Sequence, residues 1–228
     1  MAKIKDNSFV LPMPSVVLQK FFALGSRDTF WQSVGYTLLR TLLCFALSFA
    51  LALVLASLAG LFNPLHRVLA PIVTFLRAAP TVAVILILYA FMEDNSMAIA
   101  VGFLIAFPIM YSSFHSAIVG VDKDLLKMAK LYNVRPIDKI RFIYIPSIAN
   151  CLFDTSKSTL SLTLKVVIAS EILVSITLSI GERIQEAYAT FNVSYLLAWT
   201  LIAIVFSFVL EAVVAILKKI WEVTRCRV

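Results

Sequence analysis

Long apolar stretches alternate with short polar connections along the chain of 228 residues. About 20 consecutive apolar residues make a helix long enough to cross a bilayer. The pattern therefore predicts an all-α integral membrane protein with about five transmembrane helices in one domain, residues 31–220, followed by a basic tail, residues 221–228. The predicted spans are residues 33–58, 71–91, 96–121, 147–178 and 195–217.

Prolines and polar clusters mark the places where these helices should end or bend. Asn63-Pro64 follows the first span, and Glu93-Asp94-Asn95 closes the second. Pro71 suits a first helical turn, whereas Pro80 lies inside the second span. Because proline removes a backbone donor and crowds the preceding turn, we expect a kink at Pro80.

Residues 10–25 are apolar but too short and too interrupted by proline to cross a membrane. Two interpretations fit equally well: a re-entrant or interfacial helix, or a surface helix packed on the bundle. We assign residues 1–30 as an N-terminal segment on the extracytoplasmic side.

A polar, basic segment, residues 122–146, separates the third and fourth predicted spans. Apolar residues at helical spacing predict a short helix up to Tyr132, and Asn133 suits the left-handed turn that ends a helix. Pro136 can start a second helix, with Ile137, Ile140 and Ile143 on one face. This loop could lie on anionic lipid, but a short helix beside a tight turn is better suited to docking in a partner's groove.

Charge and composition support the membrane assignment. Only 14% of the residues are charged, against roughly 25% in soluble domains. The net charge of +7 resides mainly in the connections, with more Lys and Arg on the side of residues 122–146 and of the C-terminal tail. By the positive-inside rule we expect these in the cytoplasm and the N-terminus outside. We expect contact with the lipid bilayer and no binding to nucleic acid.

The sequence lacks the motifs of metal-binding proteins and of several enzyme classes. Cys44, Cys151 and Cys226 have no metal-type spacing, and no Cys/His cluster surrounds His66 or His115. We therefore expect reduced thiols and no metal site. The chain has no P-loop and no nucleophile elbow, so we predict no catalytic residues and no enzyme activity.

Polar residues inside the predicted spans are candidate functional residues, because charge in a membrane is costly. On the fourth span, helical periodicity places five of them on one stripe, which we expect to face the bundle interior. They either line a solute path, with Lys165 suited to an anionic solute or a polar headgroup, or form an internal ion pair. The stripe consists of Asp154, Lys157, Ser158, Ser161 and Lys165, and the pair would join Asp154 to Lys157.

Other polar residues lie off this stripe. Glu171 could pair with Arg77 or with another span, or cap a bend. Arg40 and Arg77 lie inside apolar runs, and Arg77 could extend to the cytoplasmic interface. Ser112, Ser113 and His115 either join helices or contact solute.

The basic segment resembles the cytoplasmic loop of permease subunits of ATP-binding-cassette (ABC) importers. In that family the loop carries Glu-Ala-Ala, three residues, Gly, nine residues, Ile, one residue and Leu-Pro. Here Ala129, Ile143 and Pro146 match the motif. Four positions depart from it: Lys127 stands for Glu, Met128 for Ala, Asn133 for Gly and Ile145 for Leu. The resemblance implies contact with an ATPase through Lys127, Met128, Ala129, Lys130, Leu131, Tyr132, Asn133 and Pro146.

Further segments resemble permeases for nitrate, sulfonates and taurine. They are LPMPSVVLQKFFAL, LLRTLLCFALSFALALVLA, FLRAAPTVAVILILYAF, KVVIASEIL and SIGERIQEAY. The resemblance implies a type I ABC importer permease in the bacterial inner membrane. It also implies a second permease copy, a cytoplasmic ABC ATPase that binds ATP and Mg, and an extracytoplasmic solute-binding protein. The alternative is a stand-alone secondary transporter or channel that uses Lys165 and Glu171.

Overall fold

The computed structural model describes residues 12–225, which contain helices and no strand. This confirms the all-α prediction. In chain order the elements are α1 (Pro14–Leu24), α2 (Asp28–Leu61), α3 (Asn63–Ala78), α4 (Thr81–Tyr89), α5 (Asp94–Val119), α6 (Lys123–Leu131), α7 (Pro136–Lys139), the π-helix η1 (Ile140–Tyr144), α8 (Ile145–Val174), α9 (Ile180–Ala189) and α10 (Val193–Arg225).

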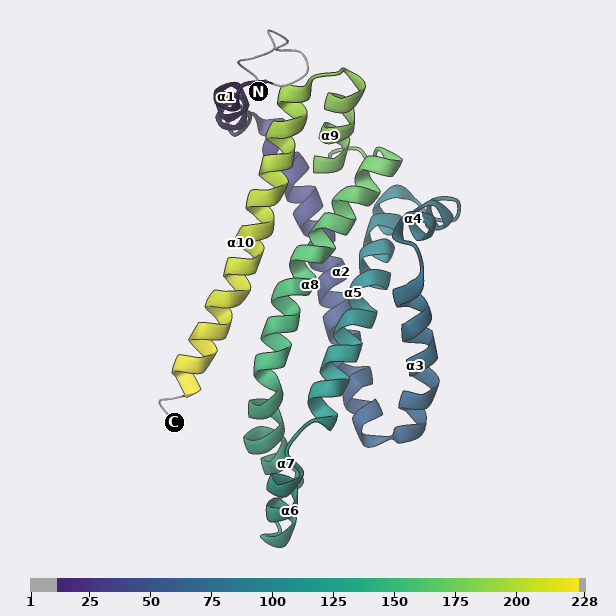
Figure 1. Ribbon diagram of the computed structural model, residues 1–228, viewed down its shortest axis with the longest axis vertical. Coiled ribbons are helices and arrows are strands. Elements are labelled where there is room, and N and C mark those ends of the chain that lie inside the picture. The colour runs from purple at the N-terminus through teal and green to yellow at the C-terminus, as the bar shows by residue number, and fades with distance from the viewer. Residues whose placement is uncertain (1–11, 226–228) are drawn as a thin grey trace.

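The long helices run up and down the longest axis of the molecule in alternating directions (Figure 1). Helices α2, α5 and α10 run one way, and α3 and α8 run back. Helices α1 and α9 lie at one end, and α6 and α7 protrude at the other. The loop between the third and fourth predicted spans is therefore separated from α9 by the length of the bundle.

Three helices of the described chain are long and apolar enough to cross a membrane: α2, residues Asn95–Val119 of α5, and residues Val193–Thr224 of α10. A fourth crossing is possible if α3 and α4 together form one broken span, and the two are bent by 94°. Helix α8 has 30 residues and corresponds to the fourth predicted span, but it carries the charged stripe.

The second predicted span, residues 71–91, is not one continuous helix. Helix α3 already begins at Asn63, so Pro71 lies inside it and not in its first turn. The prediction was a kink at Pro80, and the structure has a sharper change there: α3 ends at Ala78 and α4 begins at Thr81. Ala79 adopts an extended conformation (φ −66°, ψ 132°), as expected for a residue that precedes proline.

Small residues on α2 allow close packing of the central helices. Ala52, Ala56 and Ala59 are buried against a cluster that includes Met110 and Phe114 of α5. Such small-residue faces let helices approach closely in a membrane, where the hydrophobic effect between helices is absent. Helices α2 and α5, with α8 beside them, form the centre of the bundle.

Helix α1 lies across the end of the bundle and is seen end-on in Figure 1. Val17 and Leu24 are buried in a cluster that contains Trp199 of α10, while Phe22 is 71% exposed. Lys20 donates a hydrogen bond to Asn192 Oδ1 at 3.3 Å. Helix α1 is therefore packed against α10, and its position relative to the membrane surface stays a prediction. Residues 10 and 11 lie outside the described part of the chain.

Candidate translocation face and coupling segment

The protruding segment begins with a well-capped short helix. Asp122 accepts a hydrogen bond from the backbone N–H of Asp124 at 2.8 Å, which caps α6. At its end Asn133 has a φ of 50°, the left-handed conformation that asparagine tolerates. The N–H of Val134 bonds to the carbonyl of Ala129 at 3.0 Å. The predicted order of helix, Asn133 turn and helix start at Pro136 is confirmed.

The second half of the segment joins the next long helix. Helix α7 continues through η1 directly into α8, and Pro146 lies in the first turn of α8 and does not end the helix. The N–H of Ile145 bonds to the carbonyl of Ile140, five residues back. A π-turn widens the helix just before a proline whose ring would otherwise crowd the preceding turn. The wide turn therefore lets α8 extend without interruption into the protruding segment.

Helix α6 presents an apolar tip with cations beside it. Met128, Leu131 and Tyr132 are 54%, 81% and 79% exposed, whereas Ala129 is 5% exposed. Lys127 and Lys130 are also exposed, and Lys127 Nζ lies 2.7 Å from Asp124 Oδ1. Ala129 therefore packs inward, and most of the other coupling residues predicted on this helix point outward.

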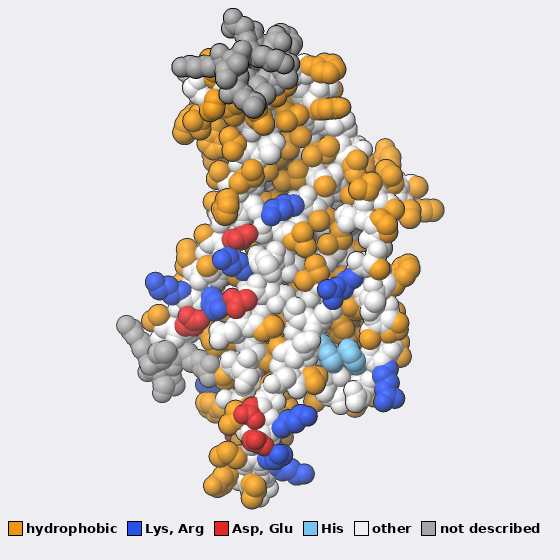
Figure 2. All heavy atoms as spheres, viewed as in Figure 1, with side chains coloured by type: hydrophobic (Ala, Val, Ile, Leu, Met, Phe, Trp, Pro, Cys, Tyr) orange, Lys and Arg blue, Asp and Glu red, His pale blue; other side chains and the backbone are white. Residues whose placement is uncertain are grey.

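The charged stripe of α8 does not face the interior of this chain, contrary to the prediction. Asp154, Lys157, Ser158 and Lys165 are exposed. Charged side chains gather down the middle of the face shown in Figure 2. Ser161 is the buried member, and its hydroxyl lies 2.6 Å from that of Ser207 on α10. Helical periodicity placed these residues on one face but could not show what covers that face.

The predicted ion pair between Asp154 and Lys157 is wrong. Asp154 instead accepts from Lys218 Nζ of α10, at 2.9 and 3.1 Å. Within the described part of the chain, neither Lys157 nor Lys165 has an ion-pair partner. The stripe therefore carries two uncompensated cations.

A hydroxyl-lined hollow of about 610 Å³ adjoins the stripe. Its lining residues are Ser112, Ser113, Ser116 and Ala117 of α5, Gly120 directly after α5, and Ser147 and Cys151 of α8. The hydroxyls of Ser112 and Ser147 donate to carbonyls of their own helices, Pro108 O at 2.8 Å and Ile143 O at 2.7 Å. Their oxygens can still accept hydrogen bonds, so the hollow can contact a polar solute.

His115 joins two helices. Its ring stacks on that of His66 of α3, with centroids 3.8 Å apart and planes 2° from parallel. His66 Nδ1 lies 3.1 Å from the buried hydroxyl of Tyr111. This contact supports the interpretation of His115 as a residue that joins helices.

Glu171 lies in a buried network and not on the charged stripe. Its side chain is fully buried and pairs with Arg40 Nη1 at 2.9 Å, which confirms pairing with another span but not with Arg77. Thr37 donates to it at 2.9 and 3.0 Å, and the N–H of Gly181 does so at 3.2 Å. Arg40 also donates to Asn95 Oδ1, from Nη2 at 2.6 Å and from Nε at 3.0 Å. The network thus joins α2, α5, α8 and α9.

The remaining candidate, Arg77, is exposed near the end of α3. It has no ion pair among the described residues. Sequence reasoning missed Thr37, Asn95 and Gly181 as members of the network. The signal that could have found the pair is the presence of two opposite charges, Arg40 and Glu171, inside apolar runs. Gly181 has no space for a side chain, because a Cβ there would collide with Glu171 Cβ.

The family model for the "Binding-protein-dependent transport system inner membrane component" matches residues 48–222. The chain belongs to this family. It is 27% identical over 177 residues to the bicarbonate transport system permease protein CmpB of Synechococcus elongatus, covering 76% of this chain and 63% of the relative. It is 26% identical over 182 residues to a probable ABC transporter permease protein of Brucella melitensis, covering 79% of this chain and 74% of the relative. The chain thus spans 63% of the length of the Synechococcus elongatus relative, which is less than two thirds.

Solved structures show the same fold at low sequence identity. One chain of the inward-facing MetNI methionine ABC transporter matches with a TM-score of 0.72 and 15% identity, covering 85% of this chain and 98% of that one. A chain of an amino acid ABC transporter matches with a TM-score of 0.68 and 15% identity, covering 93% and 99%. The helical arrangement of this family member is therefore that of ABC transporter permeases.

Proposed function

We propose that this chain is the permease subunit of a type I ABC importer and that it forms the solute path with a second permease copy. The observation that carries the proposal is the capped helix α6, which holds exposed Met128, Leu131 and Tyr132 away from the bundle. An apolar helix tip held out by a tight turn fits the groove of a soluble partner. A cytoplasmic ABC ATPase, with its ATP and Mg, would supply that groove.

The solute path would run along the charged stripe of α8 and the adjoining hydroxyl-lined hollow. An unpaired lysine that faces hydrocarbon costs about 2.5–3.5 kcal/mol near the centre of a helix. Exposed Lys165 therefore favours water or a polar second subunit in front of this face. Lys157 and Lys165 would attract an anionic solute, a class to which the bicarbonate carried by the CmpB system belongs.

The other end of the bundle would receive an extracytoplasmic solute-binding protein. Helices α1 and α9 lie there, opposite α6 (Figure 1). In the orientation that we propose, the N-terminus lies outside and the C-terminus lies in the cytoplasm of a bacterium with this chain in its inner membrane. The distribution of Lys and Arg supports this orientation.

Copurification tests the contact with the ATPase. The permease is expressed together with candidate ABC ATPases from the same organism, and the complex is captured through the permease. Met128→Pro should abolish copurification of the ATPase, because proline inside a helix destabilises it by about 3 kcal/mol or more and would disrupt α6. Met128→Leu, which keeps an apolar helix former, is the matched control. Full ATPase recovery with Met128→Pro would contradict the proposal.

The alternative of a stand-alone secondary transporter or channel needs Lys165 and Glu171 as coupling groups. Glu171 is fully buried and is held by Arg40, Thr37 and Gly181, which argues against that role. Solute flux driven by a gradient in vesicles that contain the permease and no ATPase would favour the alternative.

A further inference from the structure

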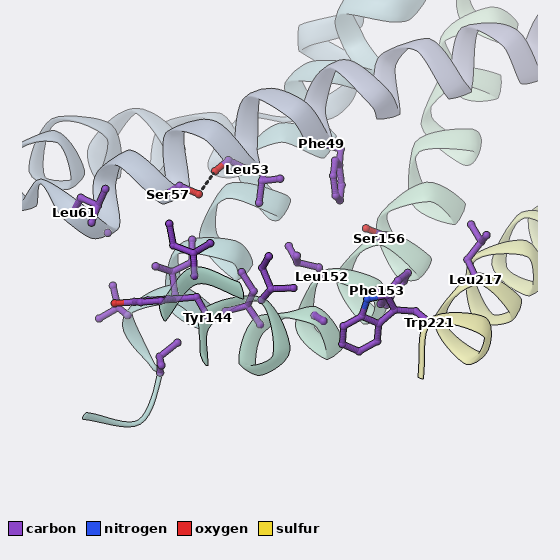
Figure 3. Close-up of a pocket in the computed structure, with 18 of the residues that line it drawn as sticks. Phe49, Leu53, Ser57, Leu61, Tyr144, Leu152, Phe153, Ser156, Leu217 and Trp221 are labelled. Carbon is purple, nitrogen blue, oxygen red and sulfur yellow. Dashed lines mark hydrogen bonds between the residues drawn. The ribbon is translucent and has the colours of Figure 1, made fainter. Parts of the chain in front are cut away.

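A second hollow lies on the opposite side of α8 from the charged stripe. Its volume is about 830 Å³, and it is open on one side. Helices α2, α8 and α10 form its walls, and side chains of α6 contribute to its lining (Figure 3). At 100° per residue, Leu152 and Ser156 of its lining lie about 160° and 200° from Asp154 around α8. No residue of the charged stripe lines this hollow.

The hollow extends along α2. The residues Phe45, Phe49, Leu53, Ser57 and Leu61 line it at intervals of four residues, and Figure 3 shows the last four of them. From Phe45 to Leu61 the helix rises about 24 Å at 1.5 Å per residue. The hydrocarbon of one bilayer leaflet is about 15 Å thick. The hollow is therefore long enough for an acyl chain that lies along the helix.

The chemistry of the lining also suits an acyl chain. Most lining residues are aliphatic or aromatic. The hydroxyl of Ser57 donates to Leu53 O within its own helix at 2.7 Å, so it needs no polar ligand. A hollow of this kind in a membrane protein would be filled by hydrocarbon more favourably than by water.

The polar lining groups indicate which lipid fits. Lys123 of α6 is the one charged residue among those that line the hollow in the described chain. Tyr144 and Trp221 also line it, and Tyr and Trp favour the level of lipid headgroups. A lysine at this level attracts a negative headgroup.

We propose that this hollow binds an acyl chain of an anionic phospholipid, with the headgroup against Lys123. The site lies behind α8, away from the proposed solute path, so the proposal does not depend on the function proposed above. Helix α10 closes one side of the hollow through the contact of Trp221 with Phe153, whose ring centroids are 5.9 Å apart. A bound lipid would fill the space between α10 and α2.

Quenching of Trp221 fluorescence by brominated lipid tests this proposal directly. The full chain with Trp31→Phe and Trp199→Phe, which leaves Trp221 as the one tryptophan, is reconstituted in vesicles. The vesicles contain increasing mole fractions of phosphatidylglycerol or phosphatidylcholine with bromine on the acyl chains. Half-maximal quenching should need about fivefold less phosphatidylglycerol, because one lysine near an anionic surface contributes about 1 kcal/mol.

Two variant pairs test the assigned residues. Lys123→Gln should remove the preference for phosphatidylglycerol, whereas Lys127→Gln, one turn further along α6, should keep it. Ser57→Phe should fill the hollow and abolish quenching at low lipid fractions. Leu58→Phe, on a lipid-exposed position of α2 that does not line the hollow, should leave quenching unchanged.

Three results would overturn the proposal: equal quenching by the two lipids, unchanged quenching in Lys123→Gln and Ser57→Phe, or no quenching of Trp221 at all. The last result would mean that protein, such as a second copy of the chain, covers the hollow. Because Trp199 is buried, its replacement could disturb folding. Mass spectrometry of lipid retained by the wild-type chain provides a second measurement, with phosphatidylglycerol expected in excess over its share of the membrane. Retention in proportion to that share would contradict the proposal.

Discussion

Arg40 of α2 and Glu171 of α8 form a buried ion pair, with Nη1 and Oε1 separated by 2.9 Å. Hydrogen bonds from Thr37 and Gly181 occupy other positions of the carboxylate. A buried pair of this kind is not by itself strong evidence of stability, but leaving one charge alone costs about 3–5 kcal/mol. The network therefore makes the positions of α2, α5, α8 and α9 depend on one another.

Glu171→Gln should lower the free energy of unfolding by about 3–5 kcal/mol, because it leaves Arg40 buried without a counter-charge. Unfolding of the purified chain in detergent, titrated with a denaturant, measures this change. Combining Glu171→Gln with Arg40→Met should recover part of the loss, because no buried charge then remains unpaired. Arg183→Gln is the control, since it breaks the exposed pair with Glu186 and should cost less than about 1 kcal/mol. A loss of that small size in Glu171→Gln would contradict the account of the network.

Gly181→Ala should destabilise the chain by about 1–3 kcal/mol, because the added Cβ would collide with Glu171 and with the backbone of Ile172. The same unfolding titration measures it. Gly35→Ala is the matched control: no atom lies within 4 Å of its added Cβ, and replacing glycine inside a helix should stabilise it by about 0.5–1 kcal/mol. If Gly181→Ala is as stable as Gly35→Ala, the close contact at Gly181 has no energetic consequence.

Ser207→Ala should lower the free energy of unfolding by about 0.6 kcal/mol, and by not more than about 1.7 kcal/mol. These are the average and the maximum for hydrogen bonds between membrane helices. The hydroxyl of Ser207 lies 2.6 Å from that of Ser161 and ties α10 to α8. Thr200→Ala is the control, because the hydroxyl of Thr200 bonds to Leu196 O in its own helix. A larger loss for Thr200→Ala would show that the bond between helices is not the relevant contact.

Lys165→Glu should raise the KM for uptake of an anionic solute at least about tenfold, because it replaces an attractive charge on the proposed path with a repulsive one. Uptake is measured in proteoliposomes that contain permease, ATPase and binding protein. Lys219→Glu changes an exposed lysine of α10 and should leave KM unchanged. An unchanged KM in Lys165→Glu would contradict the proposal that Lys165 lines the solute path.

Local chemistry allowed several features to be predicted from the sequence. The turn at Asn133 and the break before Pro80 follow from the conformations that asparagine and the residue before proline adopt. The early start of α3 was missed because a proline such as Pro71 can lie inside a membrane helix when the surroundings satisfy the freed backbone groups. Helical periodicity found the stripe on α8, but it could not show that the described chain leaves most of this stripe exposed.

Long-range contacts were beyond prediction from local patterns. Arg40 and Glu171 are 131 residues apart, and Asp154 and Lys218 are 64 residues apart. The sequence showed that each charge was unusual inside an apolar run, whereas the packing of the helices determines its partner. For the same reason the hollow between α2, α8 and α10 could not be foreseen from the spacing of Phe45, Phe49 and Leu53.

The most direct test of the central claim is solute uptake by purified permease in vesicles, with and without its ATPase and binding protein. The account predicts uptake only when both partners and ATP are present, and loss of that uptake in the variant with Lys127→Glu and Lys130→Glu. Flux through the permease alone, or normal uptake by the double variant, would contradict it.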